Sequence, residues 1–351
     1  ENRLAEPAGA ANVFTVGSVA GGTGLDARHA QDASVRPITH EWGEPSPFTR
    51  VGPGAGGVRK PDVVDLGGTA VFDVSSVSLA GAPRLPAAGV ITLNHRYTEQ
   101  FLTAAAGTSF AAPLLIHKAA RLLRRMPDAS ANLLRALLVG AARSPDAFDR
   151  RLAAMTSAER VRIGGNGVVD PSRAAYSDDH RVVLYAEDAL EMDQFAVYRL
   201  PIPPEFRTGG DRTIRVSIAY DPPVRRTRND YLGTKMDFRL LRGIDEAELF
   251  EHFRDRDKAL EGAAPAVPGR FKCKLQPGSD ERANNTLQTA SVTFKRDTRE
   301  YGEVYYLVVR CLSHWAVDQV FDQRFAVVVE LEHQPEIRIY NRVRERVQVR
   351  R

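Results

Sequence analysis

The sequence predicts two folded parts, an α/β part over residues 1–175 and an all-β part over residues 176–351. In the first part, short runs of valine and glycine precede a long apolar helix pattern at 108–125, which is typical of helices packed on a parallel sheet. From Tyr176 onward, runs rich in Val, Ile and Tyr follow one another between turn clusters, which is typical of an antiparallel sandwich. A chain of 351 residues is long enough to bury a core in each part.

The bulk composition is that of a globular protein and does not decide function. Apolar residues make up 43% of the chain and charged residues 26%, so a core and a polar surface are both expected. The formal net charge of +4 is small for this length and indicates no particular partner. No apolar run is long enough to span a membrane, and the first residues show no signal-peptide pattern, so no membrane partner is expected.

Cysteine and acidic residues give no sign of a cofactor. Cys273 and Cys311 are too few for a disulfide framework, so two buried free thiols are expected, with one bridge as the alternative. No acidic cluster has the spacing of a calcium loop. No cofactor is therefore expected and no metal ligand is identified, while the sequence leaves open whether metal ions bind.

The first part opens with strand patterns and one long polar stretch. Its β-branched or apolar runs predict strands at 12–19, 60–68 and 89–94. Residues 21–45 are polar and rich in turn formers, which favours a surface loop. The last of these strand patterns leads through a turn into the long helix.

The segment 107–113 reads Gly-Thr-Ser-Phe-Ala-Ala-Pro and opens a helix expected to run from Thr108 to about Arg125, just before Met126-Pro127. A serine among small residues at a helix start has free backbone N–H groups beside it and no bulk to block attack. Ser109 is therefore the first functional candidate, although Gly-Thr-Ser alone also suits a helix cap. The order of strand, turn and helix predicts that it lies at a carboxyl edge of the α/β sheet. Five residues share helical spacing and are expected to form the buried stripe of this helix: Ala112, Leu115, Ala119, Leu122 and Leu123.

This segment, followed by a second helical run at 131–139, resembles the serine box of subtilisin-like serine peptidases. The resemblance implies that Ser109 is the acyl-enzyme nucleophile and that its backbone N–H is a candidate oxyanion donor. Four residues match the supporting motif around it: Gly107, Thr108, Ala111 and Pro113.

Further segments extend the resemblance over the first part. Residues 46–53 are similar to the Gly-Pro-containing turn of that family, 60–68 to its Lys-Pro-Asp-Val-Val strand, and 163–171 to the glycine-rich strand and helix that close its domain. Asp65-Leu66 stand where the family usually has Ala-Pro. The implied fold is the C-terminal half of a subtilisin-like parallel-sheet domain, ending at about residue 175.

The other two members of the expected triad have no match in this chain. Subtilisin-like peptidases supply Asp, His and Ser in that order, yet no Asp-Ser-Gly, Asp-Thr-Gly or His-Gly-Thr segment precedes Ser109. The histidines His29, His40, His95 and His117 are expected to be surface or packing residues. The resemblance thus implies that Asp and His come from an N-terminal part, in cis or as a separate fragment, and that this chain alone is inactive.

A half-sheet would also present an unpaired parallel edge, which favours packing against that missing half. A pseudo-peptidase that serves as a protein-binding scaffold is the alternative, if the other half also lacks Asp or His.

The second part is expected to be a jelly-roll-like β-sandwich with one inserted helix near 244–254. Residues 218–223, Ile-Ala-Tyr-Asp-Pro-Pro, look like a strand end in the sandwich that many subtilases carry. Seven strands are expected, at 181–185, 195–200, 213–220, 286–294, 304–310, 325–331 and 337–349.

The chain as a whole is similar to large bacterial subtilases often encoded beside an AAA-type ATPase and linked to phage defence. That resemblance implies a protein or peptide substrate, the ATPase as a possible partner, and a cytoplasmic location. A second alternative is a nucleic-acid-binding role, which would use the basic residues near the C-terminal end. The simpler interpretation is that these residues form the solvent face of an edge strand. These are Arg338, Arg342, Arg344, Arg346, Arg350 and Arg351.

Overall fold

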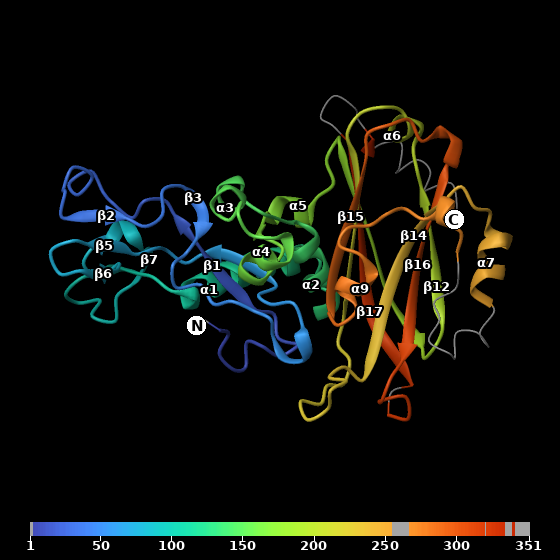
Figure 1. The fold of residues 1–351 in the computed structure, drawn as a ribbon, viewed down its shortest axis with the longest axis horizontal. Coiled ribbons are helices and arrows are strands. Elements are labelled where there is room, and N and C mark those ends of the chain that lie inside the picture. The colour runs from blue at the N-terminus through green and yellow to red at the C-terminus, as the bar shows by residue number, and fades with distance from the viewer. Residues whose placement is uncertain (1–2, 255–266, 320, 334–338, 341–351) are drawn as a thin grey trace. The chain divides into compact units, whose positions relative to one another are not determined.

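The computed structural model describes residues 3–254, 267–319, 321–333 and 339–340. The chain forms two compact units, whose elements are labelled in Figure 1. Unit 1 comprises Glu1–Ala129 and Ala141–Ala174, and unit 2 comprises Ser130–Gly140 and Ala175–Arg351. The residues between 130 and 140 thus belong with the second unit, although they lie inside the part of the sequence predicted to be α/β.

The main sheet of unit 1 has the order β3-β1-β4-β10-β9. Its strands are β1 (Val16–Gly21), β3 (Trp42–Pro45), β4 (Val63–Leu66), β9 (Ala142–Arg143) and β10 (Val168–Val169). The three central strands run parallel, while β3 and β9 pair antiparallel at the two sides. Val19 and Val64 are fully buried, because helices and loops cover both faces of the central strands.

Two expectations for this sheet are wrong. The stretch 21–45 is not all loop, because it contains β2 (Val35–Pro37) as well as β3. The outer edge of β1 is also not unpaired, since β3 pairs with it at Val19↔Pro45 and Gly21↔Trp42. Turn-forming residues dominate this stretch, so the sequence pattern did not indicate the two short strands.

Two small antiparallel sheets complete the strands of unit 1. One has the order β2-β5-β6, with β5 at Val71–Asp73 and β6 at Ser78–Ala80, and the other pairs β7 (Val90–Leu93) with β8 (Leu102–Ala105). Among the described strands β8 pairs with β7 alone, so the strand before Ser109 lies in this small sheet and not in the parallel one.

The long helix α1 spans Thr108–Arg125, as the sequence predicts, and packs against β1 and β4. Its fully buried residues are Ala111, Leu115 and Leu122. Of the predicted stripe, Leu115 and Leu122 are buried as expected, Ala112 and Ala119 are only half-buried, and Leu123 is 40% exposed. The other helical segments of unit 1 are α3 (Asp146–Arg151), α4 (Ser157–Gly164), α5 (Pro171–Ala175), η1 (Ala55–Gly57) and η2 (Pro86–Ala88).

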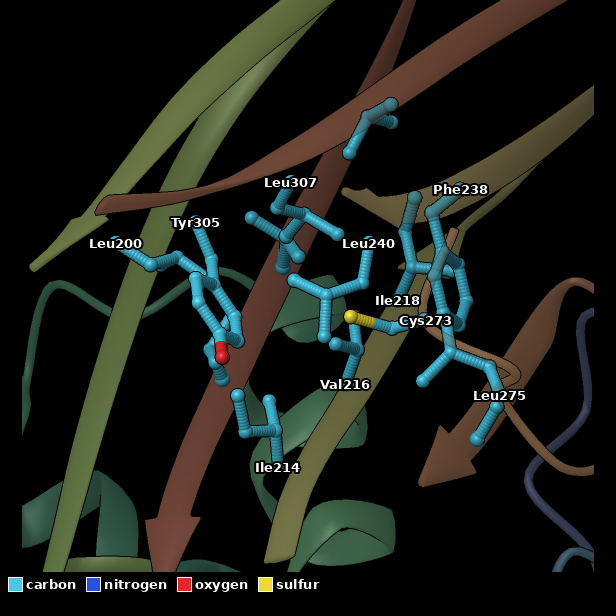
Figure 2. Close-up of a cluster of buried hydrophobic side chains, with 14 of the residues drawn as sticks. Leu200, Ile214, Val216, Ile218, Phe238, Leu240, Cys273, Leu275, Tyr305 and Leu307 are labelled. Atoms are coloured by element: carbon cyan, nitrogen blue, oxygen red, sulfur yellow. The ribbon is translucent and has the colours of Figure 1, made fainter. Parts of the chain in front are cut away.

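Unit 2 contains two antiparallel sheets, β11-β17-β13-β15 and β12-β16-β14. Their strands are β11 (Arg181–Glu191), β12 (Phe195–Pro201), β13 (Arg212–Tyr220), β14 (Thr234–Arg242), β15 (Leu287–Phe294), β16 (Val304–Ser313) and β17 (Asp322–His333). Both sheets contribute to one cluster of buried side chains, drawn in Figure 2. The jelly-roll-like sandwich remains a prediction.

The short helical segments of unit 2 include the one predicted near 244–254. They are α6 (Pro204–Arg207), α7 (Glu246–Arg254), α9 (Ser279–Arg282), η3 (Gly269–Phe271) and η4 (Arg299–Tyr301). The expected strand 337–349 and its arginines lie outside the described residues, apart from Ile339 and Tyr340.

Helix α2 (Ala131–Gly140) packs on the four-stranded sheet of unit 2, against β13 and β17. Ile218, labelled in Figure 2, and Val329 both belong to the buried cluster. Ser217 and Val328 pair in register, and because side chains alternate along a strand they lie on the opposite face. Gly140 approaches both of these residues: a Cβ added at this glycine would lie 3.2 Å from Ser217 Oγ and 3.8 Å from Val328 Cγ1. The helix therefore covers the face of the sheet that the main cluster leaves open.

The two cysteines are free and buried, as expected. Cys273 lies among the apolar side chains of Figure 2, and burial raises the pKa of both thiols to about 12. In the described part of the chain, no helix is both long and apolar enough to cross a membrane.

Candidate functional site

Ser109 is the second residue of α1 and is exposed. The first N–H groups of a helix have no acceptor within it, so the N–H of Ser109 is a backbone donor beside its own hydroxyl. The preceding Gly107 caps the helix with φ +153°, a conformation that a residue with a side chain rarely adopts. Gly107 therefore sets the turn that presents the serine.

A backbone hydrogen bond ties this turn to the main sheet. The N–H of Gly107 donates to the carbonyl oxygen of Gly67 at 2.8 Å, just beyond the end of β4. A Cβ at Gly67 would lie 2.7 Å from the oxygen of Gly107 and 2.2 Å from Ser18 Oγ, so only glycine fits. Ser109 thus lies near a carboxyl end of the parallel sheet. The contact with the residue after β4 places it there, whereas the strand that precedes it in the sequence, β8, does not.

Buried hydroxyls order the loops at the same end of the sheet. Ser18 Oγ and Ser46 Oγ are 2.7 Å apart, and Ser46 Oγ donates to the carbonyl oxygen of Gly68 at 2.6 Å. Thr49 Oγ1 accepts from the N–H of Ser18 at 3.0 Å. This network fixes the turn after β3 against the glycines that follow β4.

A buried ion pair joins α1 to β4 at a second point. Lys118 Nζ lies 2.7 Å from Asp65 Oδ2, with the two side chains 17% and 6% exposed. Within the described residues Asp65 Oδ2 has no partner of hydrogen-bond geometry, so its contact with Lys118 is a charge contact at ion-pair distance, whereas Nζ donates a hydrogen bond to the carbonyl oxygen of Val169 at 3.0 Å. Asp65, a departure from the family pattern at a strand end, is therefore held by the helix that carries Ser109.

The supporting motif residues have distinct positions in α1. Ala111 is fully buried, so a larger side chain there would have to displace close-packed neighbours. Pro113 is exposed and lies inside the helix, where it has no N–H to donate to the carbonyl of Ser109 four residues earlier. Thr108 is the first helical residue and half-buried.

The histidines preceding α1 and the one within it do not meet Ser109. His29 Nδ1 lies 2.7 Å from Asp26 Oδ1, while His40, His95 and His117 are exposed. Over the described residues, no hydrogen bond joins a histidine to Ser109 and no three His, Cys, Asp or Glu side chains gather where they could hold a metal ion. A neutral serine hydroxyl is a weak nucleophile, and it becomes reactive only when a base lies beside it.

Comparison with known proteins gives a family match for the first part of the chain. Residues 1–166 match the model of the subtilase family. The uncharacterized protein y4bN of Sinorhizobium fredii (strain NBRC 101917 / NGR234) is 54% identical over 347 residues, which are 99% of this chain and 80% of that protein.

Two solved structures are similar only at a low level. The structure of tomato aspermy virus is 19% identical and covers 44% of this chain and 79% of its own, with a TM-score of 0.19. The Aeromonas sobria serine protease, solved with a chaperone, is 13% identical and covers 83% of this chain and 56% of its own, with a TM-score of 0.23. Such low TM-scores establish no common fold. From its sequence relatives, this chain belongs to one family with the Sinorhizobium protein, and its residues 1–166 are of the subtilase type.

Proposed function

We propose that this chain is the serine-bearing part of a subtilisin-like endopeptidase, which hydrolyses peptide bonds through an acyl-enzyme on Ser109. The catalytic Asp and His come from an N-terminal part of the same peptidase domain outside these 351 residues. A companion AAA-type ATPase and a cytoplasmic location are proposed on the sequence resemblance alone.

The observation that supports this function best is the exposed Ser109 at the start of a helix anchored to the sheet. Acyl transfer needs a reachable hydroxyl, a base to take its proton and donors for the oxyanion. The site provides the hydroxyl and one donor, the N–H of Ser109 itself. An imidazole could approach from solvent, because Ser109 is exposed.

A fluorophosphonate probe on the complete protein tests the proposal, since only an activated serine reacts with it. The complete protein should be labelled on Ser109, and Ser109→Ala should lose labelling and about 10⁶-fold in kcat on a peptide substrate. Ser75→Ala is a matched control, because Ser75 is exposed in a turn after β5 and its N–H and hydroxyl both donate to the nearby Asp73 carboxylate.

The alternative, a pseudo-peptidase scaffold, predicts a folded complete protein that no fluorophosphonate labels. Full peptidase activity in Ser109→Ala would instead show that another residue is the nucleophile.

A further inference from the structure

We infer that Asp65 and Lys118 are positioning residues, which hold the serine helix in the geometry that reaction at Ser109 requires. This inference rests on the proposed function and adds to it two residues with no part in the expected triad. Neither side chain touches the serine, so both act through α1.

Helix α1 is fastened to β4 at two places. The first is the hydrogen bond from Gly107 to Gly67, two residues before Ser109. The second is the ion pair of Lys118 with Asp65, nine residues after Ser109. These two attachments, at the start and in the middle of α1, would limit how far the helix can shift relative to the strand.

The cation joins three parts of the fold at once. Lys118 extends from α1 to the carboxylate on β4 and to the carbonyl of Val169 on β10. Asp65 is itself anchored, because its Oδ1 accepts the N–H of Leu66 at 2.8 Å. Leu66 ends β4 and is followed directly by Gly67, so both attachments lie within a few residues at the end of this strand.

The chain offers a matched pair for control. Lys60 and Asp62 form another buried ion pair in unit 1, with Nζ 2.6 Å from Oδ2 and side chains 1% and 5% exposed. Lys60 also approaches the carbonyl oxygens of Ala11 and Val13, and so ties the N-terminal segment to the start of β4. Breaking this pair should destabilise the unit without releasing α1.

The test compares Lys118→Met, Asp65→Asn and Lys60→Met in the complete protein, below the temperature at which any of them unfolds. Misplacement of a nucleophile by about 1 Å can cost about 100-fold in rate. We expect the first two variants to lower kcat and the fluorophosphonate rate by roughly 10- to 100-fold, with KM within about twofold. Lys60→Met should lower the melting temperature and leave kcat unchanged.

Two further variants keep the result interpretable. Lys118→Arg retains the cation and should recover most of kcat. The double variant Asp65→Asn/Lys118→Met leaves no uncompensated buried charge, so it should fold even if a single variant does not, and it should show the same fall in kcat. An unchanged kcat in the folded Lys118 variants, or an equal fall in Lys60→Met, overturns the inference.

A readout independent of catalysis separates this inference from the proposed function. In a Ser109→Cys background, the helix start should lower the pKa of the new thiol, and the pH midpoint of its alkylation reports that effect. Lys118→Met should move this midpoint upward by up to about 0.7 pH units, and Lys60→Met should not. If the unmodified complete protein is not labelled by fluorophosphonate, the proposed function fails. The pH midpoint of alkylation still tests the role of Lys118 in that case. If Lys118→Met leaves the midpoint unchanged, Lys118 is not a positioning residue.

Discussion

Replacing Leu133 by alanine should destabilise unit 2 and leave unit 1 unaffected, although Leu133 lies within the 166 residues that match the subtilase family. Leu133 is 1% exposed on α2, which packs against β13 and β17. Removing three buried carbons forfeits about 0.8 kcal/mol each, or about 2.4 kcal/mol. The cavity left behind adds to this, so a loss of about 3 kcal/mol is expected, inside the range known for buried leucines.

The two tryptophans allow each unit to be followed separately. Trp42 lies on β3 in unit 1, and Trp315 lies in unit 2, where Arg225 stacks over its ring at 4.7 Å. Denaturant unfolding is therefore measured by fluorescence in two backgrounds, Trp42→Phe and Trp315→Phe, each leaving one reporter. Leu133→Ala should shift the transition reported by Trp315 and not the one reported by Trp42.

Leu134→Ala is the matched control, because Leu134 is its neighbour on α2 and only half-buried. It should cost clearly less than Leu133→Ala. A shift of the Trp42 transition with an unchanged Trp315 transition would refute the assignment of α2 to unit 2. Equal effects of the two leucine variants would refute the burial argument.

Three further predictions concern the glycine beside the site, the thiols and a buried arginine. Gly67→Ala places a methyl group 2.7 Å from the oxygen of Gly107 and should abolish fluorophosphonate labelling of the complete protein, whereas Gly81→Ala, whose nearest neighbour is 3.9 Å away, should not. Burial raises the pKa of the Cys273 and Cys311 thiols to about 12, above the unfolded value of about 8.5. Their contribution to stability is therefore complete below about pH 8.5 and is lost as the pH rises toward 12. Iodoacetamide should label neither thiol at pH 8 before unfolding, and a Cys→Ala double variant should lose less stability between those pH values. Arg212→Leu should cost unit 2 about 3 kcal/mol or more in Trp315-reported unfolding, because the buried guanidinium donates to the carbonyls of Phe206 and Gly210 at 2.8 and 3.0 Å.

Elements with strong local signals could be predicted from the sequence. Helix α1 has both ends specified locally, by Gly107 before it and by Met126-Pro127 after it. The strands of unit 2 rich in Val, Ile and Tyr, such as β13 and β16, were predicted to within a few residues. In each case the residues that define the element lie within it or beside it.

Strand β14 was missed because charged residues interrupt it. Thr234, Met236 and Phe238 are buried, while Lys235 and Asp237 between them are only half-buried. Alternation with a period of two was the available signal, and a search for continuous apolar runs passes over it. The pairing of α2 with unit 2 has no such signal, because an apolar helix reveals that it is buried and not what covers it.

The ion pair of Lys118 with Asp65 could have been predicted from the sequence. Ala111, Leu115, Lys118 and Leu122 follow one another at helical spacing along one stripe of α1, so a lysine lies on the buried side of the helix. A buried cation requires a counter-charge. Asp65 interrupts the apolar run of β4 directly after Val63 and Val64, so it was the acidic residue most certain to be buried in the sheet. Lys118 and Asp65 each place a charge in an otherwise apolar pattern. The two charges can neutralise each other only when α1 packs on β4.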